Sequence, residues 1–570
     1  MNIYSNVLEN IGVKNVMIKE EIKNLVQNSV KKAGFILPEV LIEKPKETDH
    51  GDYSTSLALV LSKQLKKNPM ELAQKIADNI NNKIFEKVEV VNPGFINFYL
   101  SKEFFIESII KIDKNFGKNN NLKSQKVIIE YTDANPFKRF HIGHLNSNSI
   151  GESLSRIFEF QGAKVKRANY YGDVGIHVAR AIYARKNNPN IPWPEAYAIG
   201  TKAYEEDENT RKEIIEINKK VYDRSDKEIN KLYDSGKKET LADFEKIYKK
   251  IGTKFDYNFP ESKVADFGKK IVKENLGEIF EKGEKGAVIF KGEKYGLHTR
   301  VFINSEGLPT YEAKELGLAK IKYNKYKYDQ SVVVTGNEIN EYFKVMLCAM
   351  KQIFPELAEK TKHIGHGMMR LPEGKMSSRT GNVITFESWL EEVKSLAKEK
   401  IKDRNLSQKE KDEITEKVAI GALKYSILKQ SVGSDIIYDF EKSISFEGDS
   451  GPYLQYSYAR AKSVLKKAKI EGVKVYRGRT PVTSAEVSQL EKMMQYFPEI
   501  VEKAGKEYEP HFIVLYLTEL AREFNNYYSK NKIVDKADEF SPYKVALTEA
   551  FSIIMKNGLW LLGIPTPSKM

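Results

Sequence analysis

The sequence of 570 residues contains a single cysteine, Cys348, and no uninterrupted apolar stretch long enough to cross a bilayer. One cysteine excludes a disulfide framework within the chain and a cysteine-rich zinc site. A membrane-spanning helix needs about 18 apolar residues in succession, so none is expected. The start of the chain alternates apolar and charged residues, unlike a signal peptide. We therefore expect a soluble protein of a reducing compartment, the cytoplasm, with no membrane contact.

Charge is present in excess of one sign, with 92 Lys plus Arg against 78 Asp plus Glu and a net charge of +14. A positive field favours an anionic partner such as nucleic acid. The chain is also rich in Asn and Ile, and such a mixture can come from a biased coding composition, so charge alone is equally consistent with no such role. Hydrophobic residues make up 41% and aromatic residues 11%, which excludes a disordered chain. At about 150 residues per domain, the length indicates three or four domains.

Residues 1–120 have the pattern of a small α+β domain. The spacing of apolar residues predicts helices over Ile18–Ala33 and Ser54–Leu65, and Pro69 is suited to the first turn of a third helix. The run KVEVVNPGFINFYL (87–100) predicts two short strands around a Pro-Gly turn. The residues of this block point to no chemistry of their own.

From residue 126 the pattern changes to that of a parallel sheet. VIIEYT predicts a buried strand, the sequence HIGH at His141–His144 opens a predicted helix that runs to Phe160, and a second strand covers Ala163–Tyr171. A strand, loop, helix and strand in this order build a parallel sheet, in which ligands bind beyond the carboxyl ends of the strands. We predict a Rossmann-like catalytic domain over residues 126–387.

The rest of the chain is mostly helical. The charged stretch 187–260 is typical of a helical insertion between the two halves of the sheet. Strand-like segments return at 287–290, 299–304 and 331–335. Beyond them we predict a helical stem over 388–450 and an all-α domain over 451–570. The predicted fold class is therefore a multidomain α/β protein with an α+β domain at its N-terminus and an all-α domain at its C-terminus.

The HIGH sequence at His141–His144 has the chemistry of a phosphate site. A helix N-terminus directs free N–H groups and a partial positive charge outward, which favours an anion. His141 and His144 can add side-chain donors, and Gly143 lacks a Cβ, so a nucleotide can approach the backbone. The alternative is a histidine pair at a helix start with no role.

The same four residues occur a second time, at His363–His366. This copy is followed by Gly367 and by no amphipathic helix, so the pattern predicts a strand that runs into a loop. We assign His363 and His366 no catalytic role. The two copies have the same residues, and only their predicted positions in the fold distinguish them.

The segment GKMSSRTGN (374–382) predicts a mobile cationic loop. Lys375 and Arg379 bracket two serines between glycines. Such a loop can stabilise the negative charge that builds up on a pentavalent phosphorus and on a departing pyrophosphate. Alone, the segment is equally consistent with a solvated turn. The HIGH sequence and this segment, in this order and with half a sheet between them, are a specific pair.

These motifs resemble the HIGH and KMSKS signatures of the class I aminoacyl-tRNA synthetases. More narrowly, the chain is similar to the arginyl-tRNA synthetases nearly from end to end. The segments that carry this resemblance are HGDYST (50–55), VNPGFINFYL (91–100), DANPFKRFHIGH (133–144), GDVG (172–175), FDYNFPES (255–262), GLPTYEAKEL (307–316), GKMSSRTGN, FEGDSGPYLQYSYAR (446–460) and LLGIPTPSKM (561–570).

The resemblance implies an arginine–tRNA ligase whose substrates are ATP with Mg²⁺, L-arginine and tRNA(Arg). The arginine carboxylate would attack the α-phosphorus of ATP, and the 2′-hydroxyl of the terminal adenosine of the tRNA would then accept the arginyl group. The catalytic residues it implies are His141, His144, Lys375, Ser377 and Ser378. The ATP-binding residues it implies are Ala134, Asn135, Pro136, Lys138, His141, Gly143, His144, Lys375 and Met376. Lys138 is equally consistent with a solvated loop lysine. We expect no protein-bound metal or prosthetic group, and a monomer.

Specificity for arginine requires acidic groups that match a planar guanidinium. The resemblance offers Asn135, Glu261, Tyr311 and Glu315 for this purpose. Glu315 stands where the family usually has Asp, and a Gln or His slot of the family falls on Asn337, Glu338 or Ile339 without a clear choice. For Glu261 and Glu315 a surface salt bridge is the alternative.

The C-terminal part interleaves aromatic and basic residues, as proteins do that stack unpaired bases. The residues we expect to contact tRNA are Tyr453, Tyr456, Arg460, Arg522 and Tyr527. Any one of these tyrosines, taken alone, is more typical of a helical core. Two rivals remain: another adenylate-forming enzyme, against which the helical C-terminal third argues, and a non-catalytic RNA-binding paralogue, against which the intact motifs argue.

Overall fold

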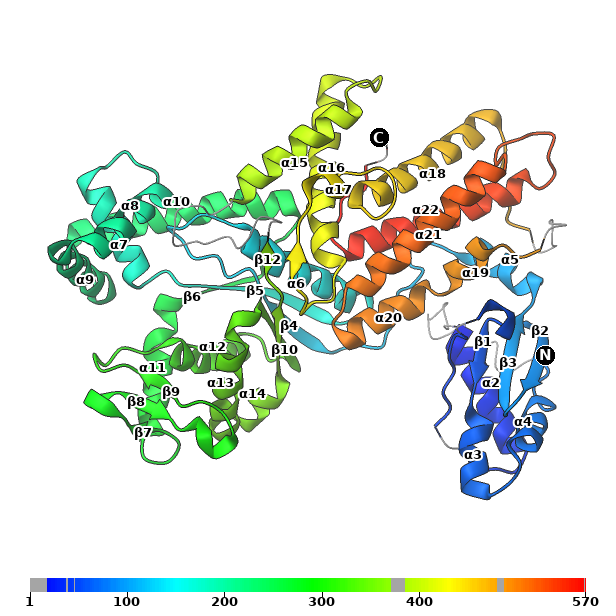
Figure 1. Ribbon diagram of the computed structural model, residues 1–570, viewed down its shortest axis with the longest axis horizontal. Helices are drawn as coiled ribbons and strands as arrows, with labels where there is room; N and C mark the ends of the chain where they lie inside the picture. The colour runs from blue at the N-terminus through cyan, green and yellow to red at the C-terminus, as the bar shows by residue number, and fades with distance from the viewer. Residues whose placement is uncertain (1–17, 37–38, 46, 371–384, 479–485, 568) are drawn as a thin grey trace.

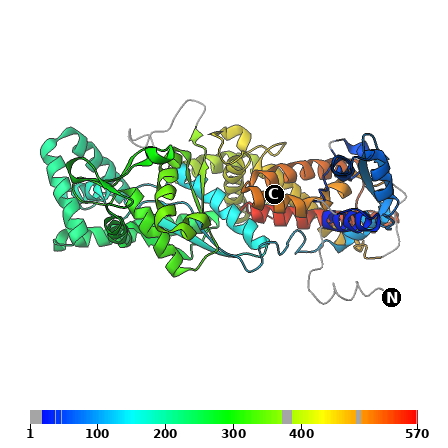
Figure 2. The same cartoon turned by 90° about the horizontal axis from the view of Figure 1, so that it is seen from below.

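The computed structural model describes residues 18–36, 39–45, 47–370, 385–478, 486–567 and 569–570. The molecule is elongated, with an N-terminal unit at one end, a helical insertion at the other and a parallel sheet between them (Figures 1 and 2). Within the described ranges, no helix is both long and apolar enough to cross a bilayer.

The N-terminal unit is an antiparallel sheet packed against helices. Its strands, in the order β1-β3-β2, are β1 (Tyr53–Thr55), β2 (Phe85–Val91) and β3 (Phe95–Leu100). Its helices are α2 (Ile18–Lys32), α3 (Leu57–Leu65) and α4 (Pro69–Ala77), and α5 (Lys102–Lys111) leads out of it.

The sequence predicted most of this unit. The two strands around Pro93 are confirmed, and Pro69 occupies the first turn of α4. The helix predicted from Ser54 is wrong at its start, because residues 53–55 form β1. Tyr53 pairs with Phe98 of β3 there, and buried and half-buried residues alternate along it as in a strand.

The middle of the molecule is a five-stranded parallel sheet with the strand order β11-β10-β4-β5-β6, so the predicted parallel sheet is confirmed. Its strands are β4 (Lys126–Glu130), β5 (Lys164–Tyr171), β6 (Tyr257–Pro260), β10 (Gln330–Gly336) and β11 (Thr361–His366). The helices of this part are α6 (Ile142–Phe160), α7 (Ile176–Asn187), α11 (Ala265–Glu274), α12 (Tyr311–Lys325), α13 (Asn340–Ile353) and α14 (Pro355–Lys360).

Two segments depart from the simple alternation of strands and helices. Between α7 and β6 the chain forms α8 (Trp193–Glu206), α9 (Glu208–Asp223) and α10 (Lys227–Ile251). After α11 it forms an antiparallel sheet of β7 (Glu281–Lys282), β8 (Val288–Phe290) and β9 (Arg300–Ile303). The strand-like segments predicted at 287–290 and 299–304 pair with each other outside the parallel sheet. The sequence could not predict this pairing, because hydropathy alone does not select a strand's partner.

The C-terminal part is helical. Its helices are α15 (Phe386–Ile401), α16 (Gln408–Leu428), α17 (Phe440–Ser443), α18 (Gly451–Glu471), α19 (Gln489–Gln495), α20 (Phe497–Glu507), α21 (His511–Lys530) and α22 (Ser541–Leu561). Two short strands, β12 (Met369–Arg370) and β13 (Ile436–Ile437), pair in parallel beside the sheet.

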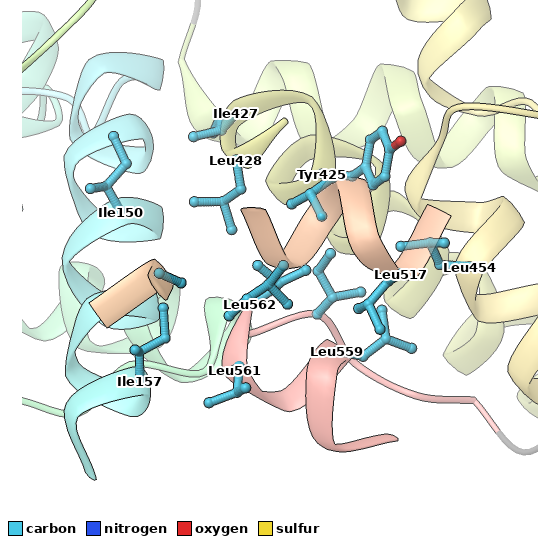
Figure 3. Close-up of a cluster of buried hydrophobic side chains, with 14 of the residues drawn as sticks. Ile150, Ile157, Tyr425, Ile427, Leu428, Leu454, Leu517, Leu559, Leu561 and Leu562 are labelled. Atoms are coloured by element: carbon cyan, nitrogen blue, oxygen red, sulfur yellow. The ribbon is translucent and has the colours of Figure 1, made fainter. Parts of the chain in front are cut away.

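One hydrophobic core joins the helix that begins at the first HIGH copy to the C-terminal helices. Ile150 and Ile157 of α6 lie opposite Leu428 of α16, with Leu517 of α21 and Leu559 of α22 in the same cluster (Figure 3). All five side chains are at most 3% exposed. The burial of each such side chain contributes about 1.5–3 kcal/mol, so α6 depends on the far end of the chain for much of its stability.

Directed hydrogen bonds reinforce this packing. The Ser153 hydroxyl donates to the Leu561 carbonyl at 2.9 Å, and the Arg156 guanidinium donates to the carbonyls of Trp560 (2.9 Å) and Gly252 (2.8 Å). The helix α6 is thus tied to the end of α22 and to the end of α10, which fixes its orientation under the sheet edge.

Candidate active site

The loops that follow β4, β5 and β6 meet at one edge of the parallel sheet. Asn135 lies in the loop after β4, Gly172 follows β5, and Glu261 follows β6. The Asn135 side-chain oxygen accepts the Gly172 N–H at 2.5 Å. A Cβ on Gly172 would lie 3.0 Å from that oxygen and 3.2 Å from Glu261 Oε2. Two of the predicted arginine-binding residues therefore converge on a glycine that leaves room for them.

The first HIGH copy caps α6. His141 is the residue before the helix, and its backbone N–H donates to Nδ1 of His144 at 3.2 Å. The two imidazole rings stack, with centroids 3.7 Å apart. Because Nδ1 of His144 accepts, its proton lies on Nε2, and this N–H remains a donor. The helix starts at Ile142, so both histidines lie where the free backbone N–H groups of α6 point outward.

Both histidines of this copy are neutral at physiological pH. Burial, with the nearby charge of Lys138, lowers the pKa of His141 to about 4. Burial and the neighbouring His141 hold the pKa of His144 well below its usual range. A neutral imidazole at a helix N-terminus can donate a hydrogen bond to a phosphate. A bound phosphate would also raise the pKa of both histidines, because its negative charge favours the protonated ring.

The loop between β4 and α6 has a strained backbone. Thr132, Asp133 and Phe137 have φ values of 84°, 51° and 69°, in the left-handed region that non-glycine residues rarely occupy. Its backbone is held from outside: Thr132 N–H donates to Ser147 of α6, and Phe137 is buried against Trp193 of the insertion. Such strain persists only where the surroundings enforce it, and it is frequent at functional sites.

An acidic cluster lies beside this loop. Glu315 of α12 is half-buried, and burial with the nearby Glu130 raises its pKa to about 8. Burial and Glu130 likewise raise the pKa of Asp133 well above its usual range. Glu130 itself is neutralised by Lys322, 2.9 Å away. Lys322 also lowers the pKa of Glu315, but within the described residues Glu315 forms no direct ion pair, and a guanidinium could supply one.

Glu261 is not the surface residue that the alternative interpretation required. It is 4% exposed and forms an ion pair with Lys314 of α12, itself 8% exposed. Burial raises the pKa of Glu261, against the effect of Lys314. Tyr311, at the start of α12, is 66% exposed, and the Lys314 ammonium lies 5.3 Å from its ring centroid.

A cavity of about 680 Å³ opens between these residues and the helical insertion. Glu261, Tyr311, Lys314 and Lys138 line it from the sheet side. From the other side it is lined by Val174, Gly175, Ile176, His177, Arg180, Tyr197, Thr201 and Glu205. Lys138 lies 5.1 Å above the Tyr197 ring, so this predicted ATP ligand is half-buried at the cavity wall. Of the remaining predicted ATP ligands, Ala134 and Pro136 are buried in the loop after β4.

The second HIGH copy is a strand, as its pattern predicts. It forms the end of β11, and His363 stacks on Phe343 with ring centroids 3.8 Å apart. His366 is 5% exposed, and its Nδ1 lies 3.1 Å from Asn146 Nδ2 and 2.9 Å from the Gly367 carbonyl oxygen. Its histidines are thus occupied by protein partners.

The predicted loop residues Lys375, Met376, Ser377 and Ser378 lie outside the described residues. The chain beyond that segment returns to the site: Thr385 forms an antiparallel bridge with His141, and Phe386 N–H donates to the Phe140 carbonyl at 3.0 Å. The residue that follows the segment therefore lies beside the first HIGH copy.

The slot that falls on Asn337, Glu338 or Ile339 forms a short 3₁₀ turn after β10. Ile339 packs against the core of this part, and Glu338 is exposed. Asn337 is half-buried.

Three of the five predicted tRNA-contacting residues lie together. Tyr453, Tyr456 and Arg460 of α18 line a cavity of about 430 Å³ with Arg404 and Asn525. The Arg460 guanidinium lies 4.8 Å from the Tyr456 ring centroid, and Asn525 donates to the Tyr453 hydroxyl at 3.1 Å.

The other two do not join this cavity. Arg522 is exposed and forms ion pairs with Glu519 and Asp449. Tyr527 packs against the core, and burial with the nearby Glu491 raises its pKa.

Sequence reasoning missed two groups of this site. Asp173, in GDVG, is fully buried and accepts hydrogen bonds from Tyr233 (2.9 Å), Lys237 (2.5 Å) and the Ser262 backbone (2.8 Å), so it fastens the insertion to the segment that carries Glu261. Lys314 was missed as the partner of Glu261 because 53 residues separate the two. The sequence did contain a signal for Asp173, because this residue follows the end of the strand β5 and could therefore be expected near a ligand.

Metal-ligand spacing is found, among the described residues, at Glu47, Asp49 and His50. All three are exposed in the N-terminal unit, at the end of the molecule away from the sheet edge (Figure 1).

Three family models match the chain. The model of the tRNA synthetases class I (R), catalytic domain, matches residues 106–440. The Arginyl tRNA synthetase N terminal domain matches residues 19–100, and the DALR anticodon binding domain matches residues 454–570.

Curated relatives match over nearly their full length. The arginine–tRNA ligase of Clostridium acetobutylicum is 33% identical over 550 residues, which cover 93% of this chain and 96% of that protein. The arginine–tRNA ligase of Fusobacterium nucleatum is 31% identical over 573 residues, 97% of this chain and 98% of that protein.

Two solved structures share the fold. The arginyl-tRNA synthetase of Thermus thermophilus has a TM-score of 0.75 at 22% identity and covers 97% of this chain and 100% of its own. That of Plasmodium falciparum has a TM-score of 0.78 at 21% identity and covers 98% and 100%. The sheet, the insertion and the helical C-terminal part are thus arranged as in these enzymes.

Proposed function

The chain belongs to the arginyl-tRNA synthetases and is an arginine–tRNA ligase, and on that premise we propose how its residues carry out the reaction. One observation supports the proposal above the others. The helix N-terminus that opens with His141 and His144, and the half-buried acid Glu315, which forms no ion pair within the described residues, lie on either side of the loop that joins β4 to α6. The first matches a nucleotide phosphate and the second a guanidinium.

In the first step, ATP lies with its phosphates at the start of α6. The neutral His141 and His144 donate to phosphate oxygens, Gly143 admits the nucleotide, and Lys138 adds positive charge from the cavity wall. Mg²⁺ arrives with ATP, whose phosphates supply most of its ligands. The arginine carboxylate oxygen forms a bond to the α-phosphorus while the bond to pyrophosphate breaks, and Lys375, Ser377 and Ser378 stabilise the departing charge.

The amino acid is held by the loops after β4 and β6. Glu261 and Glu315 pair with the guanidinium, Asn135 lies near the α-amino group, and Tyr311 covers the substrate from the start of α12. Glu261 Oε1 is bonded to Lys314, and Oε2 is directed toward the space above Gly172. Glu315 has a longer arm than the Asp that the family usually has at this place, which changes the reach of its carboxylate.

In the second step, the 3′ end of tRNA(Arg) enters through the 680 Å³ cavity. Lys138 and Arg180 would attract its phosphates, and Tyr197 offers a ring for a base. The 2′-hydroxyl oxygen of the terminal adenosine bonds to the arginyl carbonyl carbon, and AMP leaves with the electron pair of the broken C–O bond. The cavity around Tyr453, Tyr456 and Arg460 would take an unpaired base of the anticodon loop. Because one chain carries both sites, we propose that the enzyme is a monomer. We also propose that it acts in the cytoplasm.

Pyrophosphate exchange into ATP, measured with each amino acid in turn and with and without tRNA(Arg), tests the proposal. We expect exchange with arginine alone, and only when tRNA is present. Exchange with lysine, or with no amino acid, would overturn it. Lys375→Ala should slow adenylate formation much more than it weakens arginine binding, and equal losses would remove Lys375 from the transition state.

A further inference from the structure

The HGDYST sequence at 50–55 has no role in the chemistry above, and its position was unexpected. The resemblance to the arginyl-tRNA synthetases implies that the N-terminal block, residues 1–120, contacts tRNA. Within it, however, Asp52 is 5% exposed and Tyr53 is fully buried. Residues this deeply buried cannot contact RNA. Their polar groups face the C-terminal helices α19 and α20, more than 400 residues away in the sequence.

Tyr53 forms the centre of this contact. Its hydroxyl donates to Glu499 Oε1 of α20 at 2.6 Å, and its ring meets the Tyr496 ring edge-on, with centroids 5.9 Å apart. Burial raises the pKa of Glu499, which the bond from Tyr53 lowers. The Lys44 ammonium lies 4.0 Å from the Tyr496 ring centroid on the same side.

Asp52 binds both partners at once. Its Oδ2 accepts the Leu100 N–H at the end of β3 at 2.8 Å, and its Oδ1 pairs with Lys492 of α19 at 2.9 Å. The Tyr496 hydroxyl donates to the Asp52 backbone carbonyl at 3.3 Å. Gly51 permits this approach, since its φ is 90° and a Cβ there would lie 2.8 Å from the Phe98 carbonyl oxygen.

These contacts suit a joint that sets an orientation. An apolar interface tolerates sliding, whereas hydrogen bonds to the buried Asp52 and the half-buried Glu499 are directional and costly to break. The joint connects the antiparallel sheet of the N-terminal unit to the helices that precede α21, which is the region of the molecule where these two parts meet in Figure 1.

We propose that Asp52 and Tyr53 are positioning residues for tRNA binding. They hold the N-terminal unit against α19 and α20, so that the N-terminal unit and the C-terminal helices contact one tRNA at a fixed separation. This inference rests on the proposed function in one respect, that the N-terminal unit and the C-terminal helices bind the same tRNA. If the joint were loosened, part of the free energy of tRNA binding would be used to restore that separation, so tRNA would bind more weakly. The residues at the carboxyl ends of the parallel strands would be unchanged.

Aminoacylation kinetics of Tyr53→Phe and Lys492→Met in the full-length enzyme test the joint. We expect the KM for tRNA(Arg) to rise about 5–20-fold, since Tyr53→Phe removes the bond to the half-buried Glu499 and Lys492→Met removes the bond to the buried Asp52. The kcat, the KM values for arginine and ATP, and the charging of a minihelix that carries only the acceptor stem should stay within twofold. Glu499→Gln, whose amide oxygen still accepts from Tyr53, should retain most of the tRNA affinity.

Tyr99→Phe is the matched control, because Tyr99 of β3 donates to the Asp49 carbonyl (2.7 Å) and to Glu89 (3.0 Å) within the N-terminal unit. An unchanged KM for tRNA in both joint variants, or an equal rise in Tyr99→Phe, would overturn the proposal. So would a parallel rise in the KM for arginine, which indicates a general loss of structure. If Tyr53→Phe did not fold, Lys492→Met would decide, because Lys492 is partly exposed. Failure of the wild-type enzyme to charge tRNA(Arg) would instead count against the proposed function.

Discussion

The two copies of HIGH contain the same four residues and have opposite surroundings. In the first copy, at His141–His144, the rings lie at a helix N-terminus, and the Nε2–H of His144 has no hydrogen-bond partner among the described residues. In the second, at His363–His366, the rings lie in a strand, where Phe343 covers one and Asn146 contacts the other. The same four residues therefore keep a donor available for a ligand in one place and are bonded to protein groups in the other, depending on the element that carries them.

The copies are also connected. Asn146 belongs to α6, the helix that the first copy opens, and its amide also donates to the Gly367 carbonyl at 3.0 Å. The second copy therefore helps to hold the first in place. The comparison predicts that changes in the first copy lower the rate, while changes in the second lower the stability.

The largest expected effect is that of His144→Ala. Removal of a donor to a charge that develops in the transition state lowers rates by about 10²–10³-fold. Arginine-dependent pyrophosphate exchange should fall by that factor, with little change in the urea midpoint. His366→Ala is the control in the second copy and should lose less than tenfold in exchange. Equal losses in the two variants would remove the distinction between the copies.

The acids near the two copies should differ in their effect on arginine binding. Glu315, near Asp133 of the loop that leads to the first copy, has its pKa raised to about 8, so it must lose a proton when a guanidinium binds. The KM for arginine should therefore fall by up to about tenfold per pH unit as the pH rises from about 6 to 8, and then level off. Glu315→Gln should abolish this dependence, measured by aminoacylation at saturating ATP and tRNA.

Glu338→Gln is its control, since Glu338 is exposed near His366 of the second copy. It should leave the pH dependence of the KM for arginine as in the wild type. A flat profile in the wild-type enzyme would contradict the assignment of Glu315 as a guanidinium ligand.

The two central glycines should respond differently to a methyl group. A Cβ on Gly365 would lie 2.0 Å from Asn340 Oδ1, whereas a Cβ on Gly143 would lie 3.1 Å from the His141 ring. Gly365→Ala should therefore cost about 1–3 kcal/mol in the free energy of unfolding. Gly143→Ala should cost less stability and more activity, because its methyl group occupies the space of the nucleotide. Urea unfolding and pyrophosphate exchange on both variants decide, and a reversed order would be inconsistent with the comparison.

The smallest effect concerns histidine titration. Burial lowers the pKa of both His141 and His363 to about 4. Bound ATP should raise the pKa of His141 by about one unit, since a phosphate stabilises the imidazolium by roughly 1.4 kcal/mol per unit. That of His363 should stay where it is. NMR of ¹³C-labelled histidine with and without ATP measures both, and a shift at His363 alone would contradict the model of the site.

The sequence was sufficient for the elements that local pattern controls. The strand before Thr132, the helix after His141 and the strand at 164–171 follow from runs and periods of apolar residues, which is why the first HIGH copy could be placed at a helix start. The residue pair Asn135 and Glu261 could be named from resemblance, and the structure shows that the two meet at Gly172.

The rest depends on distant partners. The segment at Ser54 reads as helix by its hydropathy and becomes strand because β3 lies beside it. Tyr527 and Tyr453 lie on neighbouring helices and both pack against the same core, and only the tertiary packing decides that Tyr453 also lines a cavity. The cations that neutralise Glu130 and Glu261 are 192 and 53 residues away, beyond the reach of any local pattern.

The bonds from Ser153 and Arg156 to the carbonyls of Leu561 and Trp560 have a consequence for synthesis on the ribosome. These partners are 408 and 404 residues later in the chain. At about 5–20 residues per second, translation takes roughly 20–80 s to deliver them. During that time Ile150 and Ile157 of the nascent chain lack the helices that cover them, and they are natural targets for a chaperone. The helix that opens with His141 and His144 is thus made in the first third of the chain, and its packing is completed only by the last helix.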